Sequence, residues 1–428
     1  MDGFSHRNNQ LCCEDVPVAS LARRYGTPLY VYSQAAIVAR LRDLQDAFRP
    51  ASPLICCSVK ANTNLSILRL LGKAGAGFDI VSGGELFAVL KAGGNPEKIV
   101  FAGVGKSPDE IRKAVKAGIY LFNAESESEL LAIERAAGGA GRVVRVALRL
   151  NPDVDAHTHA KTTTGKKENK FGIAADRAMS VFLHRARYPH LDLCGIHFHL
   201  GSPLYSAEPF RSALRKVAPF VKQARALGAN LRTLNAGGGY CISYDGKPVI
   251  GPKDYAQAIL PAVRALNLKL IIEPGRFIVG NASVLLSRVI YRKVGWHNRR
   301  FVILDAGMND LIRPAFYGAY HHIWPVAGAA SPLLGGRGGG RKETVDIVGP
   351  ICETSDCFAR DRRVPPIREG DLVAIYGAGA YGMAMSSTYN SRPRPAEVMV
   401  AGRRSRMIRK RETYEDLIRG ECCQSLAR

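Results

Sequence analysis

The sequence predicts an α/β protein, a (β/α)8 barrel joined to a β-rich domain. Eight short apolar runs alternate with stretches of helical periodicity over the first two-thirds of the 428 residues. After Gly280 the pattern changes to strand-like stretches separated by turns. The chain also exceeds the roughly 250–300 residues at which one hydrophobic core stops growing, which favours two domains.

The eight apolar runs have the length of buried parallel strands. They are residues 54–59, 77–81, 99–102, 121–122, 143–150, 193–199, 233–235 and 268–273. The helical stretches between them are residues 66–74, 84–92, 108–117, 126–136, 175–187, 209–227 and 252–266. Strands that alternate with helices in this way are typical of a TIM-like barrel.

The strands expected in the β-rich domain, a sandwich or barrel, are residues 283–291, 301–305, 344–348, 371–375 and 396–400. We expect the barrel to span residues 35–281. The β-rich domain would then combine residues 1–34 with residues 282–428.

Composition is that of a soluble globular protein, with 46% hydrophobic and 23% charged residues. The apolar runs are too short to cross a membrane, which takes about 20 residues, and the N-terminus lacks the apolar core of a secretory signal. We therefore expect a cytoplasmic protein without a membrane partner. Its ten cysteines are expected to be reduced thiols, and they lack the paired C-x-x-C spacing of a zinc site, so no metal is predicted.

The chain is strongly basic, with 60 Lys and Arg against 37 Asp and Glu and a net charge of +23. Such an excess can indicate nucleic-acid binding. However, the basic residues are spread along the chain, and the densest run, residues 403–411, has apolar residues interleaved as in a strand. A solvated face is therefore favoured over a specific nucleic-acid site, although an anionic substrate or cofactor would also be attracted.

Polar residues that suit chemistry follow the predicted barrel strands, at the end where this fold places its active sites. Lys60 closes the first strand in the run Ser58-Val59-Lys60-Ala61-Asn62. A low dielectric there would depress the pKa of the amine and favour a Schiff base. Asp79 ends the second strand, and it could equally be a helix cap or turn residue.

Three later strand ends add further candidates. His197 and His199 share one strand face, which permits either metal ligation or stacking of an imidazole on a planar ring. Gly237–Gly239 form either a phosphate-binding turn or a plain tight turn. Glu273 could keep a pyridinium nitrogen protonated, and Arg276 could bind a carboxylate through two hydrogen bonds.

In combination these motifs resemble the diaminopimelate decarboxylase family, a branch of the alanine-racemase-like pyridoxal phosphate enzymes. The resemblance extends nearly end to end. Residues 25–32 resemble the family's opening strand and residues 164–172 its mobile active-site loop, and the motifs at residues 305–310, 352–356 and 379–382 follow in the family's order.

The resemblance implies pyridoxal 5'-phosphate as the cofactor. Lys60 would carry it covalently, Glu273 would pair with the pyridine nitrogen and His199 would stack on the ring. Asp79 is placed among the cofactor-binding residues. The phosphate would be held by Ser202, Gly237, Gly238, Gly239, Gly275, Arg276 and Tyr381.

The resemblance also implies a substrate and an assembly. Arg276, Arg313, Tyr317 and Tyr381 look like the family's substrate-binding set, with the two arginines on the distal carboxylate of diaminopimelate, and Glu353 would take its distal ammonium. Lys60 and Cys352 would be the catalytic residues. In the family the site lies at a homodimer interface, so Cys352 and Glu353 would come from the neighbouring subunit.

The expected activity is decarboxylation of meso-2,6-diaminopimelate to L-lysine and carbon dioxide, the last step of lysine biosynthesis. Alternatives of the same fold and cofactor are decarboxylases of ornithine, arginine or carboxynorspermidine, and an amino-acid racemase. A non-catalytic pyridoxal carrier is a further alternative, but it would lack the β-rich domain. Arg313 could also be an ordinary surface arginine, a reading that its context outweighs.

Overall fold

The computed structural model describes residues 3–154, 170–328, 330–336, 338 and 340–422. The chain divides into two compact units. The first comprises Ile37–Ile242 and Pro248–Ile278, and the second comprises Met1–Ala36, Ser243–Lys247 and Val279–Arg428. Most of the proposed mobile loop, residues 164–169, lies outside the described residues.

The first unit is a closed barrel of parallel strands, which confirms the predicted fold class. All eight predicted strands form, in chain order around the barrel. Their bounds are β5 (Leu54–Ser58), β6 (Gly77–Ile80), β7 (Ile99–Phe101), β8 (Leu121–Ala124), β9 (Val144–Arg149), β10 (Leu191–His197), β11 (Thr233–Asn235) and β12 (Lys269–Ile272). Ile271 and Ile272 of β12 pair with Leu54 and Ile55 of β5, which closes the barrel.

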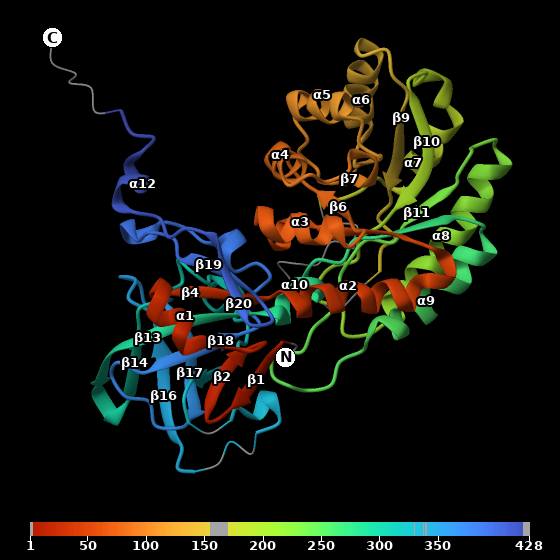
Figure 1. The fold of residues 1–428 in the computed structure, drawn as a ribbon. Helices are drawn as coiled ribbons and strands as arrows, with labels where there is room; N and C mark the ends of the chain where they lie inside the picture. The colour runs from red at the N-terminus through yellow and green to blue at the C-terminus, as the bar shows by residue number, and fades with distance from the viewer. Residues whose placement is uncertain (1–2, 155–169, 329, 337, 339, 423–428) are drawn as a thin grey trace, which may run out of the picture. The chain divides into compact units, whose positions relative to one another are not determined.

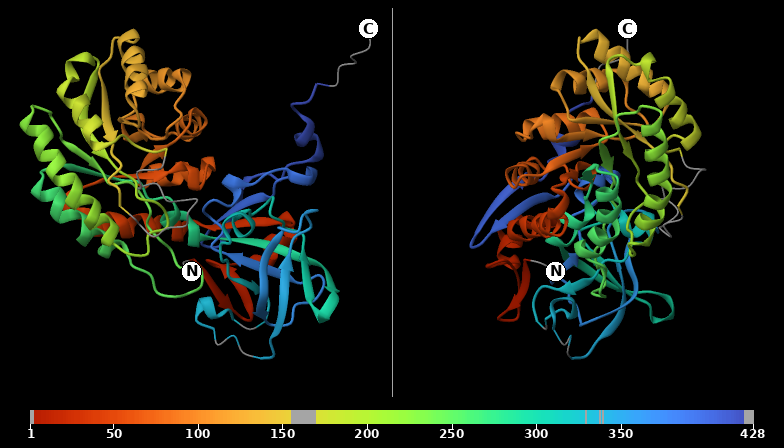
Figure 2. Two further views of the ribbon diagram at one scale, coloured as in Figure 1. Left: turned by 180° about the vertical axis from the view of Figure 1, so that it is seen from behind. Right: turned by 90° about the vertical axis from the view of Figure 1, so that its right-hand side faces the viewer.

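Helices surround these strands on the outside (Figure 1), and the two further views of Figure 2 show the same arrangement. They are α2 (Gln34–Phe48), which leads into the barrel, α3 (Leu65–Lys73), α4 (Gly83–Lys91), α5 (Pro108–Ala117), α6 (Glu127–Gly139), α7 (Ala175–Leu183), α8 (Glu208–Ala226) and α9 (Pro252–Ala265). Local sequence explains their ends. For example, α5 begins at a capping box formed by Ser107 and Glu110 and stops at Gly118, whose φ is 71°.

The barrel interior is packed with small and branched side chains. Strands β5, β7, β8, β9, β10 and β12 each contribute one buried residue to a single cluster, namely Cys56, Val100, Leu121, Ala147, Cys194 and Ile271. Burial raises the pKa of the Cys194 thiol to about 11. These two cysteines therefore serve as packing residues, as the sequence predicted for most of the thiols.

The second unit is built on a nine-stranded sheet, of which seven strands follow the order β17-β16-β14-β13-β4-β19-β20, while β18 pairs with β13 and with β15. The bounds are β4 (Leu29–Ser33), β13 (Ser283–Val294), β14 (Arg300–Leu304), β15 (Ile323–Pro325), β16 (Glu343–Val348), β17 (Cys357–Val364), β18 (Leu372–Tyr376), β19 (Ala396–Ala401) and β20 (Arg404–Arg409). A separate small sheet contains β1 (Phe4–Arg7), β2 (Gln10–Cys13) and β3 (Val16–Pro17). Short helices are α1 (Val18–Tyr25), α10 (Arg276–Val279), α11 (Arg313–Tyr317) and α12 (Tyr414–Ile418).

The N-terminal strand β4 lies in the middle of this sheet. Val31 pairs with Val284 of β13 on one side and with Val398 of β19 on the other. These three valines are fully buried in one core cluster of the unit. Segments from both ends of the chain therefore share a hydrophobic core.

Several elements were not predicted from the sequence, among them α2, β15 and β17. Strand β17 carries Arg360, Arg362 and Arg363 and lies at one end of the sheet order. An edge strand needs no continuous apolar face, so its sequence lacks the alternation on which strand prediction depends. Strand β20 at the opposite end also contains three arginines.

Among the described residues, no helix is long and apolar enough to cross a membrane.

We predict that Leu270→Ala, in β12, lowers the free energy of unfolding by about 2–5 kcal/mol, because Leu270 is fully buried and its truncation leaves a cavity. The measurement is urea denaturation followed by circular dichroism. Leu131→Ala is the matched control, since Leu131 is 50% exposed, and it should change stability by less than about 0.5 kcal/mol. Equal losses in the two variants would contradict the assigned barrel core.

Candidate functional site

The carboxyl ends of the barrel strands bring together four of the predicted site residues. Lys60 lies in the short turn that follows β5, Asp79 lies in β6, His199 follows β10 and Glu273 follows β12. Because all eight strands are parallel, their carboxyl ends meet at one mouth of the barrel. Residues up to 213 positions apart in the sequence are thereby gathered in one site.

Lys60 and Asp79 form an ion pair in this mouth. Lys60 Nζ lies 2.8 Å from Oδ2 of Asp79, which also accepts a hydrogen bond of 2.7 Å from Ser58 Oγ. The Asp79 side chain is fully buried, whereas that of Lys60 is 36% exposed. Burial and the nearby Glu273 raise the pKa of Asp79, and Lys60 opposes that rise. Asp79 is thus a strand residue facing the lysine, and neither a helix cap nor a turn residue.

Glu273 is a buried carboxylate held by side chains from three other strands. Its Oε1 accepts hydrogen bonds from Asn235 Nδ2 at 2.6 Å and from Asn123 Nδ2 at 3.2 Å. Its Oε2 lies 3.5 Å from Nε2 of His197. Burial alone would raise the pKa of Glu273, but His197 and Lys60 outweigh burial and hold that pKa well below its usual range. Glu273 is therefore ionised at neutral pH.

His199 is a neutral imidazole with a defined tautomer. Its Nδ1 accepts a hydrogen bond of 3.1 Å from the backbone N–H of Gly238, so the ring hydrogen is on Nε2. Burial and the charges of Arg149 and Lys60 lower the pKa of His199 to about 3. An uncharged flat ring at this position is suited to stacking on another planar group.

The turn of three glycines is sterically required. A Cβ on Gly237, Gly238 or Gly239 would come within 2.5 Å of a backbone carbonyl oxygen, and Gly237 and Gly239 have positive φ values of 68° and 104°. The N–H of Gly237 donates to Asn235 Oδ1, and that of Gly238 donates to His199. Two of the three N–H groups therefore hold the turn itself.

The remaining barrel residues of the predicted site surround this turn and the lysine. Ser202 follows Gly201, whose carbonyl oxygen faces Gly239. Gly275 packs so closely on Ser58 and Ala61 that a Cβ there would lie 3.0 and 3.1 Å from their Cβ atoms. Arg276 begins α10 and is buried.

The β-rich unit contains the other predicted residues. Arg313 and Tyr317 belong to α11, and Arg313 is only 6% exposed, so it is not an ordinary surface arginine. Tyr381 follows β18 with a φ of 57°, an uncommon conformation for a tyrosine. Cys352 and Glu353 lie between β16 and β17.

The Cys352 segment is held by polar contacts within the same unit. The backbone N–H of Cys352 donates to Asn390 Oδ1 at 2.8 Å, and Glu353 accepts a hydrogen bond from Ser355 Oγ. Asp356 accepts hydrogen bonds of 2.7 Å from the backbone of Ile351 and of Met308. The Cys352 side chain is exposed in the chain as described.

Sequence reasoning missed several residues of the barrel mouth. Asn123 and Asn235 were given no role, although Asn235 stands two residues before Gly237, the first of the three glycines, which was a usable signal. A buried ion pair was also missed, with Arg149 Nη1 donating to Glu125 Oε1 at 2.7 Å. Its partners are 24 residues apart, so only the barrel topology brings them together.

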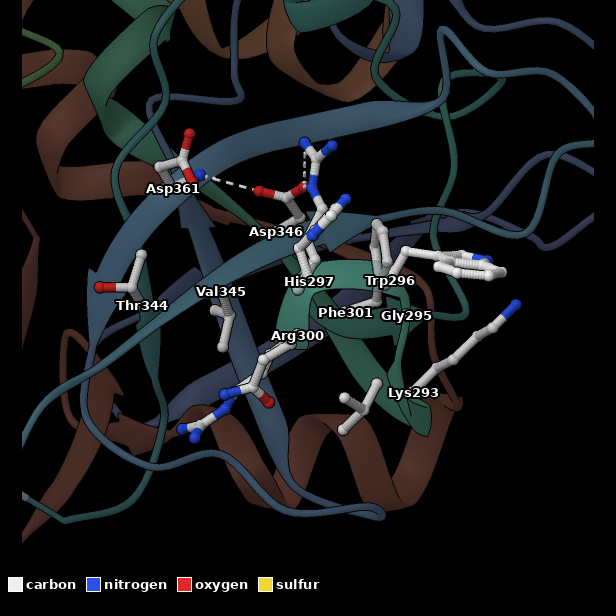
Figure 3. A pocket seen from close by; sticks show the side chains of 13 residues that line it. Lys293, Gly295, Trp296, His297, Arg300, Phe301, Thr344, Val345, Asp346 and Asp361 are labelled. Atoms are coloured by element: carbon white, nitrogen blue, oxygen red, sulfur yellow. Dashed lines mark hydrogen bonds and ion pairs between the residues drawn. The ribbon is translucent and has the colours of Figure 1, made fainter.

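Outside the barrel mouth, neither a metal-binding cluster nor the pocket of the β-rich unit involves the predicted site residues. Among the described residues, no group of three or more His, Cys, Asp and Glu side chains is placed to hold a metal ion. The β-rich unit has an open pocket of about 1200 Å³ beside the turn between β13 and β14, lined by Trp296, Arg300 and Asp346 among others (Figure 3). Asp346 in this pocket is already paired with Arg299 at 2.5 Å. The predicted site residues do not line it.

The residues of the barrel mouth fit pyridoxal phosphate. Oδ1 of Asp79 and Nδ1 of His197 are buried with no hydrogen-bond partner among the described residues. Orphaned polar groups of this kind beside a lysine are typical of a site built for a polar ligand. An ionised carboxylate, a neutral imidazole and a glycine turn suit a pyridine ring and its phosphate. The fold and site together define a pyridoxal-binding barrel enzyme.

Comparison with known proteins agrees with that class. The family described as pyridoxal-dependent decarboxylase, pyridoxal binding domain, matches residues 34–280. Diaminopimelate decarboxylase from Pseudomonas aeruginosa is 47% identical over 423 residues, covering 98% of this chain and 99% of the relative. The chain belongs to the diaminopimelate decarboxylase family of pyridoxal-dependent decarboxylases.

Solved structures give the same result. The crystal structure of diaminopimelate decarboxylase from Helicobacter pylori complexed with L-lysine has a TM-score of 0.88 at 43% identity, covering 94% of this chain and 98% of the other. The enzyme from M. jannaschii in complex with L-lysine has a TM-score of 0.92 at 37% identity, covering 99% and 98%. The similarity therefore includes both units of the chain.

One prediction concerns Glu85, in the first turn of α4 next to the barrel mouth. Burial raises the pKa of Glu85 from 4.5 to about 7, against the hydrogen bond that it accepts from Val81 N–H. A group whose pKa is raised by folding stabilises the fold at low pH, so this contribution is lost as the pH rises from about 4.5 to 7. The shift corresponds to about 3 kcal/mol.

Glu85→Gln should flatten the dependence of the free energy of unfolding on pH in this window, as measured by denaturation at several pH values. Glu97→Gln is a control of the same chemistry in an exposed 3-10 turn. An unchanged pH profile in Glu85→Gln would contradict the raised pKa.

Proposed function

We propose that this protein decarboxylates meso-2,6-diaminopimelate to L-lysine and carbon dioxide, the last step of lysine biosynthesis, with pyridoxal 5'-phosphate as cofactor. The observation that carries the proposal is the near full-length similarity to diaminopimelate decarboxylases, 47% over 98% of the chain. The β-rich unit argues against the alternative of a small barrel that only carries the cofactor, because such a carrier would lack this unit.

The residues of the barrel mouth have distinct roles in this proposal. Lys60 carries the cofactor, and Asp79 holds the lysine side chain in place through the contact of 2.8 Å. Glu273, kept ionised by its neighbours, pairs with the pyridine nitrogen, and neutral His199 stacks on the ring. The bound cofactor supplies the electron sink for the negative charge left on the substrate carbon when carbon dioxide leaves.

We assign the phosphate to Ser202, Gly237–Gly239, Gly275, Arg276 and Tyr381. Within the turn of glycines, the N–H of Gly239 is the best donor, since those of Gly237 and Gly238 already hold Asn235 and His199. Gly237 and Gly238 instead let the backbone come close to Phe198 and Glu273. The glycines thus shape the phosphate site more than they donate to it.

Substrate recognition is assigned to Arg276, Arg313, Tyr317 and Tyr381, with the two arginines on the distal carboxylate. Glu353 takes the distal ammonium. A guanidinium binds a carboxylate through two parallel hydrogen bonds, which gives geometric selectivity as well as attraction. Substrates such as ornithine and lysine lack that carboxylate and do not use this clamp.

After carbon dioxide leaves, a proton must be added to the substrate carbon. Two groups of the chain are candidates for this step, the amine of Lys60 and the thiol of Cys352. We propose a homodimer in which Cys352 and Glu353 complete the site of the neighbouring subunit. We also propose that the protein acts in the cytoplasm.

The first prediction of the proposed function concerns which substrates are converted and which products are formed. Purified protein with added pyridoxal phosphate should release carbon dioxide and L-lysine from meso-diaminopimelate, but should not turn over ornithine, arginine or carboxynorspermidine. Chromatographic product analysis measures this, and Lys60→Ala is the inactive control because it removes the amine that holds the cofactor. Turnover of ornithine instead would refute the distal-carboxylate clamp. Cofactor absorbance without any turnover would favour a carrier.

A further prediction concerns the proton donor. Cys352→Ala should lower kcat by about 100-fold, in the usual range for loss of a general acid, with little change in cofactor affinity. Steady-state kinetics and the stereochemistry of the lysine formed in deuterium oxide provide the measurement. Cys422→Ala, at another exposed thiol, is the matched control. Full turnover with unchanged stereochemistry in Cys352→Ala would remove this thiol from the reaction.

A further inference from the structure

Two side chains, His321 and Tyr244, hold Arg313 within the β-rich unit. Arg313 Nη1 donates a hydrogen bond to Nε2 of His321 at 2.9 Å. The guanidinium carbon lies 4.8 Å from the centroid of the Tyr244 ring. The rings of Tyr244 and His321 are in turn 5.2 Å apart at an angle of 73°. The three side chains therefore form one contiguous cluster.

The tautomer of His321 follows from this geometry. A guanidinium has only donors, so Nε2 of His321 must be the acceptor. The ring hydrogen is then on Nδ1, which donates to the backbone carbonyl oxygen of Tyr376 at 2.8 Å. His321 is fully buried, and both of its ring nitrogens are used. A neutral imidazole therefore connects Arg313 to the backbone of β18.

The segment around His321 is itself anchored. Arg362 of β17 donates from Nη1 to the backbone oxygen of His321 at 2.9 Å, and its guanidinium lies 4.2 Å from the ring centroid of Tyr320. The imidazole of His321 is thus held by the backbone of β18, and the backbone of His321 is held by a side chain of β17. Because the imidazole of His321 is fixed, the guanidinium of Arg313 that bonds to it is also held in one orientation.

The contacts with His321 and Tyr244 orient the guanidinium without adding negative charge beside it. Arginine has many rotamers, and ordering such a side chain during binding reduces affinity. An arginine that is oriented before the substrate arrives avoids that cost and presents its donors to a carboxylate in a fixed direction.

We propose that His321 is a positioning residue that makes the site selective for a substrate with a distal carboxylate, and that Tyr244 assists it. This inference rests on the proposed function, in which Arg313 binds that carboxylate. It extends the proposal from the arginine to the two residues that orient it.

The test compares two ligands of one variant. Decarboxylation removes the carboxylate at the reacting carbon, so the product L-lysine keeps the distal one. Cadaverine (1,5-diaminopentane) has the two amines of diaminopimelate at the same spacing but lacks both carboxylates. In His321→Leu, the KM for meso-diaminopimelate should rise roughly 10- to 100-fold, the range expected for loss of a hydrogen bond to a charged group. The inhibition constant of cadaverine should change little, and so should cofactor affinity, measured from absorbance in titrations with pyridoxal phosphate.

Conservative and matched variants separate positioning from folding. His321→Gln can still accept from Arg313 and donate to Tyr376, so it should recover most of the loss. His322→Leu is the matched control, because His322 stacks on Trp324 and bonds Ser331 Oγ at 2.8 Å, and it should keep the KM of the unaltered protein. If His321→Leu fails to fold, Tyr244→Leu tests the same cluster and should also weaken the binding of diaminopimelate more than that of cadaverine.

Two outcomes would overturn the positioning role of His321. One is an equal weakening of the binding of diaminopimelate and of cadaverine, and the other is a loss in His321→Gln as large as that in His321→Leu. A failure of the proposed function can be told apart from these outcomes. In that case the unaltered protein would not decarboxylate diaminopimelate at all.

Discussion

The candidate site depends on a buried negative charge, the carboxylate of Glu273. An ionised carboxylate inside a protein costs several kcal/mol unless other groups compensate it. Here the amides of Asn123 and Asn235 donate to one oxygen, and His197 lies beside the other. Asn235 also binds the N–H of Gly237, and the N–H of Glu273 donates to the carbonyl oxygen of Gly237 at 2.8 Å. The carboxylate and the glycine turn are therefore one rigid assembly.

Both units share a second feature. In each of them, a polar side chain of the site is held by an uncharged partner. The N–H of Gly238 fixes the tautomer of His199, and the ring of His321 fixes Arg313. A neutral partner orients a side chain without cancelling a charge that a ligand can use. There are exceptions, since Arg149 pairs with Glu125 and Asp79 pairs with Lys60. That pair keeps the amine close to a buried carboxylate in the mouth of the barrel.

Much of the fold could be predicted from the sequence, since buried parallel strands are continuous apolar runs and the helices between them are amphipathic. The helix α2 and the strands β15 and β17 were missed. For β17 the reason is that an edge strand lacks a regular apolar face. The motifs around Lys60, the glycines and Glu273 were visible as short local patterns. The partners Asn123, Arg149 and His321 were not, because their roles depend on contacts that only the folded chain creates.

The two terminal strands of the β-rich sheet carry an unusual share of arginine. Arg360 and Arg363 of β17 and Arg404, Arg406 and Arg409 of β20 are all exposed, at opposite ends of the sheet order. Open sheet edges can pair with those of other molecules, and charged side chains along them oppose such pairing. We therefore infer that part of the excess positive charge has a colloidal role, in which like-charged edges keep neighbouring molecules apart at high concentration. Because salt screens such repulsion, we expect the solubility of the protein to depend on ionic strength.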